Sequence, residues 1–143
     1  MKLGWDDLFL RFDENLRTIV SWQPEDPDPS AQRCEQSRHR TLGHLRACQE
    51  QWLIVLRAFL ECESPSIKIV HPWRMFEVQK YAHLPWEVHL RKFVLDREEW
   101  MRLRDEPLRD RSGLRNGIQD STLGLTRRLA CHEISHLSVF AHE

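Results

Sequence analysis

The sequence predicts an all-α fold, an antiparallel four-helix bundle that forms a single domain over residues 1–143. Three observations support this prediction. Four segments place their apolar residues at the spacing of an amphipathic helix. No two segments have the alternating pattern of paired strands, and a lone strand would have no partner. A chain of 143 residues is most simply one domain, and it is long enough to bury a sizeable core.

The first two helices are predicted from the spacing of their apolar residues. The first runs from about Trp5 to Trp22. Residues 23–30 then hold three prolines among acidic side chains, a composition typical of an extended and exposed connection. The second helix covers about 37–62. Its inner stripe includes Cys48, and His44 lies one turn earlier on the same side.

The middle of the chain is expected to hold a loop and one short helix. Prolines and serines at 64–66 end the second helix, and we interpret residues 67–73 as a loop packed on the bundle. A short helix is expected over about 73–81. The third long helix starts at Pro85, because proline suits the first helical turn, and its stripe includes Trp100.

The last helix is predicted after a loop at residues 111–117. Ser121 is the expected N-cap, with Asp120 as the alternative, and the helix runs nearly to the end of the sequence. Four amphipathic helices of this length would pack in antiparallel fashion around one apolar core.

The composition is that of an ordinary globular protein and argues against a nucleic-acid partner. The chain carries 21 basic and 22 acidic side chains, for a net charge of −1. Binding to DNA or RNA normally requires a clear basic excess. No segment has the uninterrupted apolar length of a membrane-spanning helix, so we expect no membrane partner.

The N-terminus and the cysteines predict a cytoplasmic location. Asp6 and Asp7 stand where a signal peptide would have its apolar run. The four cysteines form no CxxC pair, and their density is not that of a disulfide framework. Both features are typical of a protein in a reducing compartment.

The strongest functional signal is a pair of histidines, His132 and His136, four residues apart in the last helix. At this spacing they lie on one face, about 40° apart and one turn along, where two imidazoles can share a metal ion. They continue the apolar stripe of Leu125 and Leu129, so they should point into the bundle. Burying two imidazoles without partners is costly. Carboxylate partners would remove that cost, but the paired spacing favours a metal.

The same run matches the HExxH pattern of zinc proteases, in which Glu133 would be the general base. His142 even stands at the spacing of a third zinc ligand. That pattern, however, needs a glycine between the second and third histidines, and Val139 stands there. No sheet edge is expected that would hold an extended peptide. A protease is therefore the weakest of the hypotheses.

A third ligand is expected from a facing helix, because helical bundles build their metal sites in this way. His44 is the best candidate, since it lies on the inner side of the second helix. His71, His83 and His89 are weaker candidates, placed in or near loops or on the presumed outer face. The resulting site would have three neutral imidazoles and one position open to water or substrate.

The whole chain resembles the DinB/YfiT-like proteins, that is, the DinB superfamily. The resemblance rests on the spacing of short motifs along the predicted helices. These are Gly43-His44 early in the second helix, Trp86 through Trp100 in the third, and Gly117 with Ser121-Thr122-Leu123 leading into His132, His136 and Leu137.

The resemblance implies a four-helix bundle with a divalent metal on three histidines, at the positions of His44, His132 and His136. The metal would be nickel, zinc, iron or manganese, often in a homodimer. Some relatives are thiol S-transferases that use the low-molecular-weight thiols bacillithiol or mycothiol. The family name implies no DNA binding.

Five further residues are candidates for the site, each with a structural alternative. Glu133 would be a catalytic base near the metal, or it would face a neighbouring helix and pair with an arginine. Cys48 would border the substrate pocket or fill the core. Arg97 would bind a substrate carboxylate or pair with a surface acid. Trp52 and Trp100 would be pocket walls or core residues.

Three functional hypotheses follow from the sequence. The leading one is a metal-dependent enzyme that acts on a small molecule, either a thiol S-transferase or a hydrolase. The alternative is a non-catalytic helical bundle, in which the histidines make hydrogen bonds or hold a structural metal. An HExxH zinc protease is the third.

Overall fold

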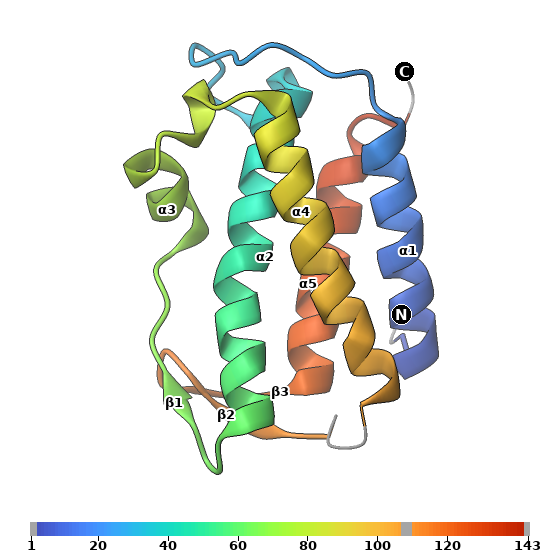
Figure 1. Cartoon of the computed structure of the whole chain (residues 1–143), viewed down its shortest axis with the longest axis vertical. Coiled ribbons are helices and arrows are strands. Elements are labelled where there is room, and N and C mark those ends of the chain that lie inside the picture. Colours follow the sequence, from blue (N-terminus) through green and yellow to red (C-terminus); the bar gives the residue numbers. More distant parts are fainter. Residues whose placement is uncertain (1–2, 107–109, 142–143) are drawn as a thin grey trace.

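The computed structural model describes residues 3–106 and 110–141. Four long helices lie side by side along the molecule (Figure 1). They are α1 (Trp5–Ser21), α2 (Arg38–Glu61), α4 (Trp86–Met101) and α5 (Thr122–Ser138). Helix α2 packs on both α4 and α5, and α1 covers the remaining side of α4 and α5. The mostly helical fold is thus confirmed. No helix in the described residues has the length and apolar character needed to cross a membrane.

A short helix lies beside α2, and three single-turn helical segments lie at the ends of the long helices. Helix α3 (Pro72–Val78) leans on α2, with Pro72 in its first turn and His71 as its N-cap. Single 3₁₀ turns form η1 (Cys34–Gln36), η2 (Tyr81–His83) and η3 (Arg102–Asp105). The expected N-cap of α5 is also found, because the Ser121 side chain accepts a hydrogen bond from Gly124 N.

The expectation that the chain has no sheet is wrong. A small three-stranded sheet closes one end of the bundle, in the order β1 (Ser66–Ile67), β2 (Ser112–Arg115) and β3 (Ile118–Ser121). Strand β1 runs parallel to β2, and β2 runs antiparallel to β3. The segment interpreted as a loop therefore finds its partner nearly fifty residues later in the chain, with Ser66 opposite Leu114.

Two features of the β2–β3 hairpin allow the sheet to form. Asn116 and Gly117 form its two-residue turn, and both have positive φ, 50° and 79°, as the tight turns that match strand twist require. Gly113 lets β2 approach the end of α2 closely. A Cβ atom at this position would lie 2.7 Å from the Phe59 ring and 2.8 Å from the Pro65 carbonyl oxygen.

The two larger of three apolar clusters are separated by a buried polar layer, and the third lies around Phe76 and Tyr81. One cluster, near the sheet, contains Phe12, Phe59 and Trp100, and the other, at the opposite end, contains Leu45 and Phe93. Between them, Arg97 of α4 and Glu133 of α5 form an ion pair in which neither side chain is exposed to solvent.

The remaining hydrogen bonds of this pair come from α1 and α2. Arg97 Nε donates to Gln49 Oε1 at 2.7 Å, and its Nη1 donates to the Phe12 carbonyl at 3.1 Å. Asn15 Nδ2 donates to Glu133 Oε1 at 3.0 Å. We call these four side chains, Asn15, Gln49, Arg97 and Glu133, the central polar network. It joins all four long helices and leaves neither buried charge without partners.

A second buried group connects α2, α4 and η2 around His89. The sequence placed His89 on an outer face, but the structure buries it completely. Its Nε2 donates to the Tyr81 carbonyl at 2.8 Å, and its Nδ1 accepts from Arg46 Nη1 at 3.0 Å. Burial is the main reason why the pKa of His89 falls to about 4, and the charge of Arg46 lowers it further. A proton on Nδ1 would meet the guanidinium that now donates to this atom.

The Arg97→Met substitution tests the central polar network. It should cost about 3–5 kcal/mol of unfolding free energy, because Glu133 would stay buried without its cation. Urea denaturation measures this cost. The Arg97→Met/Glu133→Leu double variant should recover most of the loss. Arg57→Met is the matched control, because the Arg57–Glu99 pair is exposed and should contribute under about 1 kcal/mol. Equal losses in the two single variants would contradict the assignment.

Metal-free protein should lose stability as the pH falls from about 6.5 towards 4, and His89 should account for part of that loss. Its pKa is lower in the folded chain than in the unfolded chain, so the unfolded chain binds the extra proton in this window. The His89→Gln variant should therefore show a smaller change of unfolding free energy with pH than the wild type does. Urea denaturation at several pH values measures both slopes, and identical slopes would contradict this role.

Candidate metal centre

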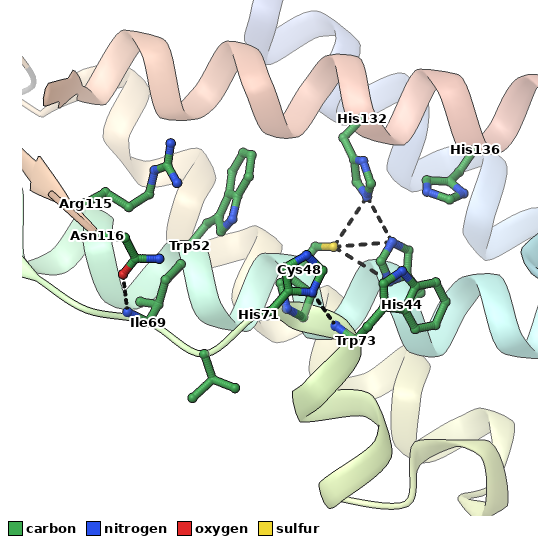
Figure 2. A pocket seen from close by; sticks show the side chains of 12 residues that line it. His44, Cys48, Trp52, Ile69, His71, Trp73, Arg115, Asn116, His132 and His136 are labelled. Atoms are coloured by element: carbon green, nitrogen blue, oxygen red, sulfur yellow. Dashed lines mark hydrogen bonds between the residues drawn. The ribbon is translucent and has the colours of Figure 1, made fainter. Parts of the chain in front are cut away.

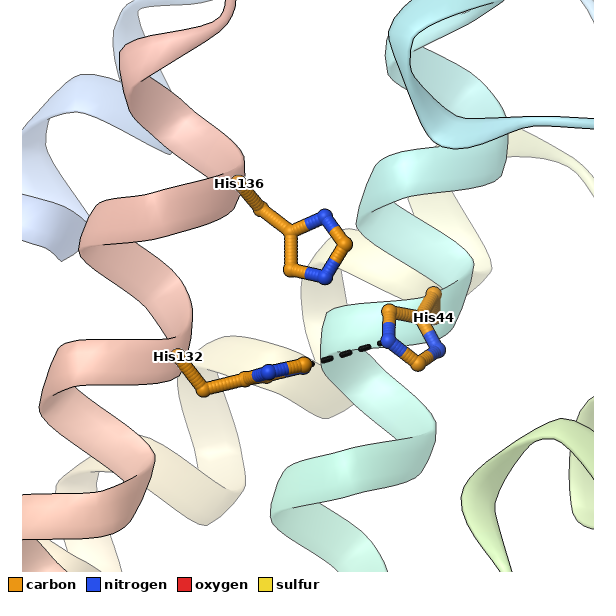
Figure 3. Close-up of side chains that lie close together, drawn as sticks. All are labelled: His44, His132 and His136. Carbon is orange, nitrogen blue, oxygen red and sulfur yellow. Dashed lines mark hydrogen bonds between the residues drawn. The ribbon is translucent and has the colours of Figure 1, made fainter.

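The structure brings together the three histidines that the sequence singled out. His44 projects from α2, and His132 and His136 project from the facing side of α5 (Figure 3). One ring nitrogen from each lies within 4.8 Å of those of the other two. His44 Nε2 and His132 Nε2 are 3.1 Å apart. The cluster forms because two helical residues four apart share a face, and α2 packs against that face of α5.

The aromatic side chain of Trp73 fixes the ring of His44. It comes from α3 and stacks on the imidazole with 3.9 Å between centroids and only 10° between planes. Figure 2 shows this stack beside Cys48. The Cys48 sulfur lies 3.3 Å from His132 Nε2 and 3.6 Å from His44 Nε2.

All three histidines have lowered pKa values, which favours their neutral form. Burial is the main cause in each case. It lowers the pKa of His44 to about 3, with help from the two neighbouring histidines, and that of His132 to about 4. The pKa of His136 is lowered as well. Burial raises the pKa of the Cys48 thiol, so this group keeps its proton when no cation is near. Neutral imidazoles present free lone pairs, which metal binding requires.

One distance in the cluster matches that expected around a divalent transition metal. Two nitrogens bound tetrahedrally to one zinc ion, each about 2.0–2.1 Å away, are about 3.3–3.4 Å apart. The 3.1 Å between His44 Nε2 and His132 Nε2 is close to that value. Imidazole is a ligand suited to zinc, nickel and iron. The same 3.1 Å also fits a hydrogen bond between two neutral rings, which is compatible with the non-catalytic alternative.

An open cavity of about 680 Å³ lies beside the histidines. The three imidazoles and Cys48 form one end, and Arg115 and Asn116 of the β2–β3 hairpin lie at the other (Figure 2). Trp52 and the segment 69–73 line the space between these ends. The cavity therefore combines a mostly apolar wall with polar groups at both ends, the usual composition of a small-molecule site.

Two of the four predicted pocket residues line this cavity, and two lie elsewhere. Cys48 and Trp52 line it. Arg97 belongs to the central polar network and is fully buried. Trp100 is fully buried as well, in the core near the sheet, where its indole nitrogen donates to Thr126 Oγ1 at 3.1 Å. Neither side chain has access to a substrate in the cavity.

Glu133 points away from the histidines. It follows His132 in the helix, so its side chain projects about 100° further round, into the central polar network. Burial raises the pKa of its carboxyl group, and Arg97 opposes that rise. The structure thus shows the arginine pairing that was the alternative to a catalytic base. This placement removes the general base that a zinc protease needs.

Two further arguments about a protease concerned the absence of a sheet edge and the position of His142. A sheet is present after all, and the β2–β3 hairpin contributes to the cavity wall. His142, which has the spacing of a third zinc ligand, lies outside the described residues.

The remaining candidate histidines lie outside the cluster. His71 lines the cavity, but its Nδ1 accepts a hydrogen bond from Trp73 N at 3.2 Å. His83 lies in η2 and lines a separate surface pocket, and His89 is held between Tyr81 and Arg46.

Sequence reasoning did not assign several residues of the cavity, among them Trp73, Arg115 and Asn116. Trp73 was not singled out because nothing in the sequence shows that α3 packs over His44. Arg115 and Asn116 reach the cavity through the hairpin, which the sequence analysis did not foresee. The dipeptide Asn116-Gly117 was the local signal for that hairpin.

Comparisons of the chain with protein-family models, with curated proteins and with solved structures found no match.

Proposed function

We propose that this chain is a DinB-like divalent-metal protein that acts on a small molecule. His44, His132 and His136 would hold one nickel, zinc, iron or manganese ion at the inner end of the cavity. The observation that carries the proposal is the cluster itself, in which three neutral imidazoles converge within 4.8 Å beside an open cavity. A metal bound there would act as a Lewis acid and lower the pKa of a bound thiol or water.

The chain's own residues would bind and orient the substrate. Three neutral imidazoles add no negative charge, so they leave the charge of the cation free to attract an anion. Trp52 and Trp73 present flat apolar surfaces along the cavity, and they would exclude water from the reacting end. Trp73 also holds the His44 ring through stacking, which keeps its nitrogen directed towards His132.

The far end of the cavity would recognise a polar or anionic group. Arg115 and Arg128 both approach the single carboxylate of Asp120, so this end keeps a net positive charge. Asn116 is held in place because its Oδ1 accepts from Ile69 N at 2.9 Å. These contacts suit a substrate whose reactive group lies at the histidines and whose anionic group lies at Arg115.

Two reactions suit this arrangement, thiol S-transfer and hydrolysis. The open cavity supports an enzyme over a non-catalytic bundle, because a site that only braces the fold needs no space beside it. All four cysteines are free, as expected in a reducing compartment, and this supports the proposed cytoplasmic location. The homodimer remains a proposal that rests on the family resemblance.

Metal content tests the proposal directly. Wild-type protein purified without a metal-affinity tag should contain one transition-metal ion per chain, measured by mass spectrometry. His44→Ala should contain less metal, because it removes one of the clustered imidazoles and so weakens binding. His83→Ala is the control, since His83 lies in η2 outside the cluster, and it should keep the metal. A wild type that stays metal-free after divalent ions are supplied would favour the non-catalytic bundle.

A further inference from the structure

Helices α2 and α5 present matching pairs of metal-binding side chains to one another. On α5 these are His132 and His136, four residues apart. On α2, His44 and Cys48 have the same spacing and therefore share a face. Figure 2 shows the Cys48 sulfur directed at the space between His44 and His132, not away from it. The Cys48 sulfur thus adjoins two of the three clustered histidines.

The distances among three of these atoms match one face of a zinc tetrahedron. Zinc lies about 2.0–2.1 Å from imidazole nitrogen and about 2.3 Å from thiolate sulfur, which puts nitrogen and sulfur about 3.5–3.6 Å apart. The Cys48 sulfur is 3.3 Å from His132 Nε2 and 3.6 Å from His44 Nε2. With 3.1 Å between the two nitrogens, all three edges are close to their expected lengths.

The fourth corner belongs to His136. In a tetrahedron, the two remaining ligands lie on opposite sides of any edge. Figure 2 shows Cys48 on one side of the His44–His132 line and His136 on the other. A ring nitrogen of His136 lies within 4.8 Å of the ligand nitrogens of both, and its side chain would have to rotate towards them to complete the site.

We propose that Cys48 is the fourth protein ligand of the metal, so that the site is His₃Cys and its thiolate comes from the chain. This inference rests on the metal site of the proposed function. When the metal binds, the Cys48 thiol releases its proton to solvent, and a sulfur lone pair forms the bond to the metal. Packing in the core alone does not explain the position of the Cys48 sulfur, because a cysteine that only fills the core needs no contact with two imidazole nitrogens.

A fourth ligand from the chain changes what the site can do. Thiolate with imidazole favours zinc over manganese, which prefers oxygen ligands. The Cys48 thiolate would also cancel one positive charge of the metal and fill the position that an external thiol would occupy. A substrate in the cavity would then reach the metal by displacing Cys48 or by raising the coordination number to five.

Cobalt(II) substitution tests the proposal without any assay of activity. Thiolate ligation of cobalt(II) gives an intense charge-transfer band in the near ultraviolet, and ligation by imidazole alone does not. Wild-type protein loaded with cobalt should show this band. Cys48→Ser should bind cobalt through the three histidines but lose the band. Cys34→Ser is the matched control, because Cys34 is also buried but lies outside the cluster, and it should keep the band.

The outcomes separate this proposal from the metal site itself. Cobalt bound to the wild type without the band would overturn the role of Cys48 and leave the three-histidine site intact. A band that survives in Cys48→Ser would overturn it as well. Failure of the wild type to bind cobalt at all would overturn both proposals. X-ray absorption of the zinc-loaded wild type needs no variant, and it should show one sulfur at about 2.3 Å beside the nitrogens. A shell of nitrogen and oxygen only would refute the proposal.

Discussion

The buried ion pair of Arg97 and Glu133 is the one polar contact that connects all four long helices through its hydrogen bonds in the described residues. Both side chains are fully buried, and their hydrogen bonds reach α1 and α2 as well as their own helices. The network fixes α5 about its axis, because Glu133 finds its partners only when that face is turned inward. His132, one residue earlier and about 100° away, is then directed at α2. The orientation of the histidines thus depends on a contact in which they take no part.

A buried charge is costly without partners, and here that cost favours one arrangement of the helices over others. If α5 slipped by one turn against α4, Glu133 would leave Arg97 and two charges would be stranded in an apolar core. Apolar residues alone would tolerate such a slip more easily. We infer that the network selects the register in which His44 meets His132 and His136. The positions of the three histidines thus depend on buried polar contacts.

The long helices and the three histidines could be predicted because both depend on local spacing. Apolar periodicity marked the helices, and the spacing of His132 and His136 marked one face of α5. The features that were missed depend on partners far away in the chain. Strand β1 forms only because Leu114 lies opposite Ser66. The arginine pairing of Glu133 was foreseen as an alternative, but not that its partner would be Arg97, 36 residues earlier. A sequence pattern shows which face a residue occupies, but not what will pack against it.

The cavity and the histidine cluster are built from the same face of α2. His44, Cys48 and Trp52 follow one another at four-residue steps, so one side of this helix runs from the histidine end of the cavity along its wall. A metal at the histidines would lie at the end of the cavity and not inside a closed core. Its reactivity would then depend on the balance between the chain's own thiolate and whatever enters past Trp52. If Cys48 binds the metal tightly, no coordination position is open to a substrate and the centre is mainly structural. If the thiolate can be displaced, the same four side chains form a site where an incoming ligand is activated.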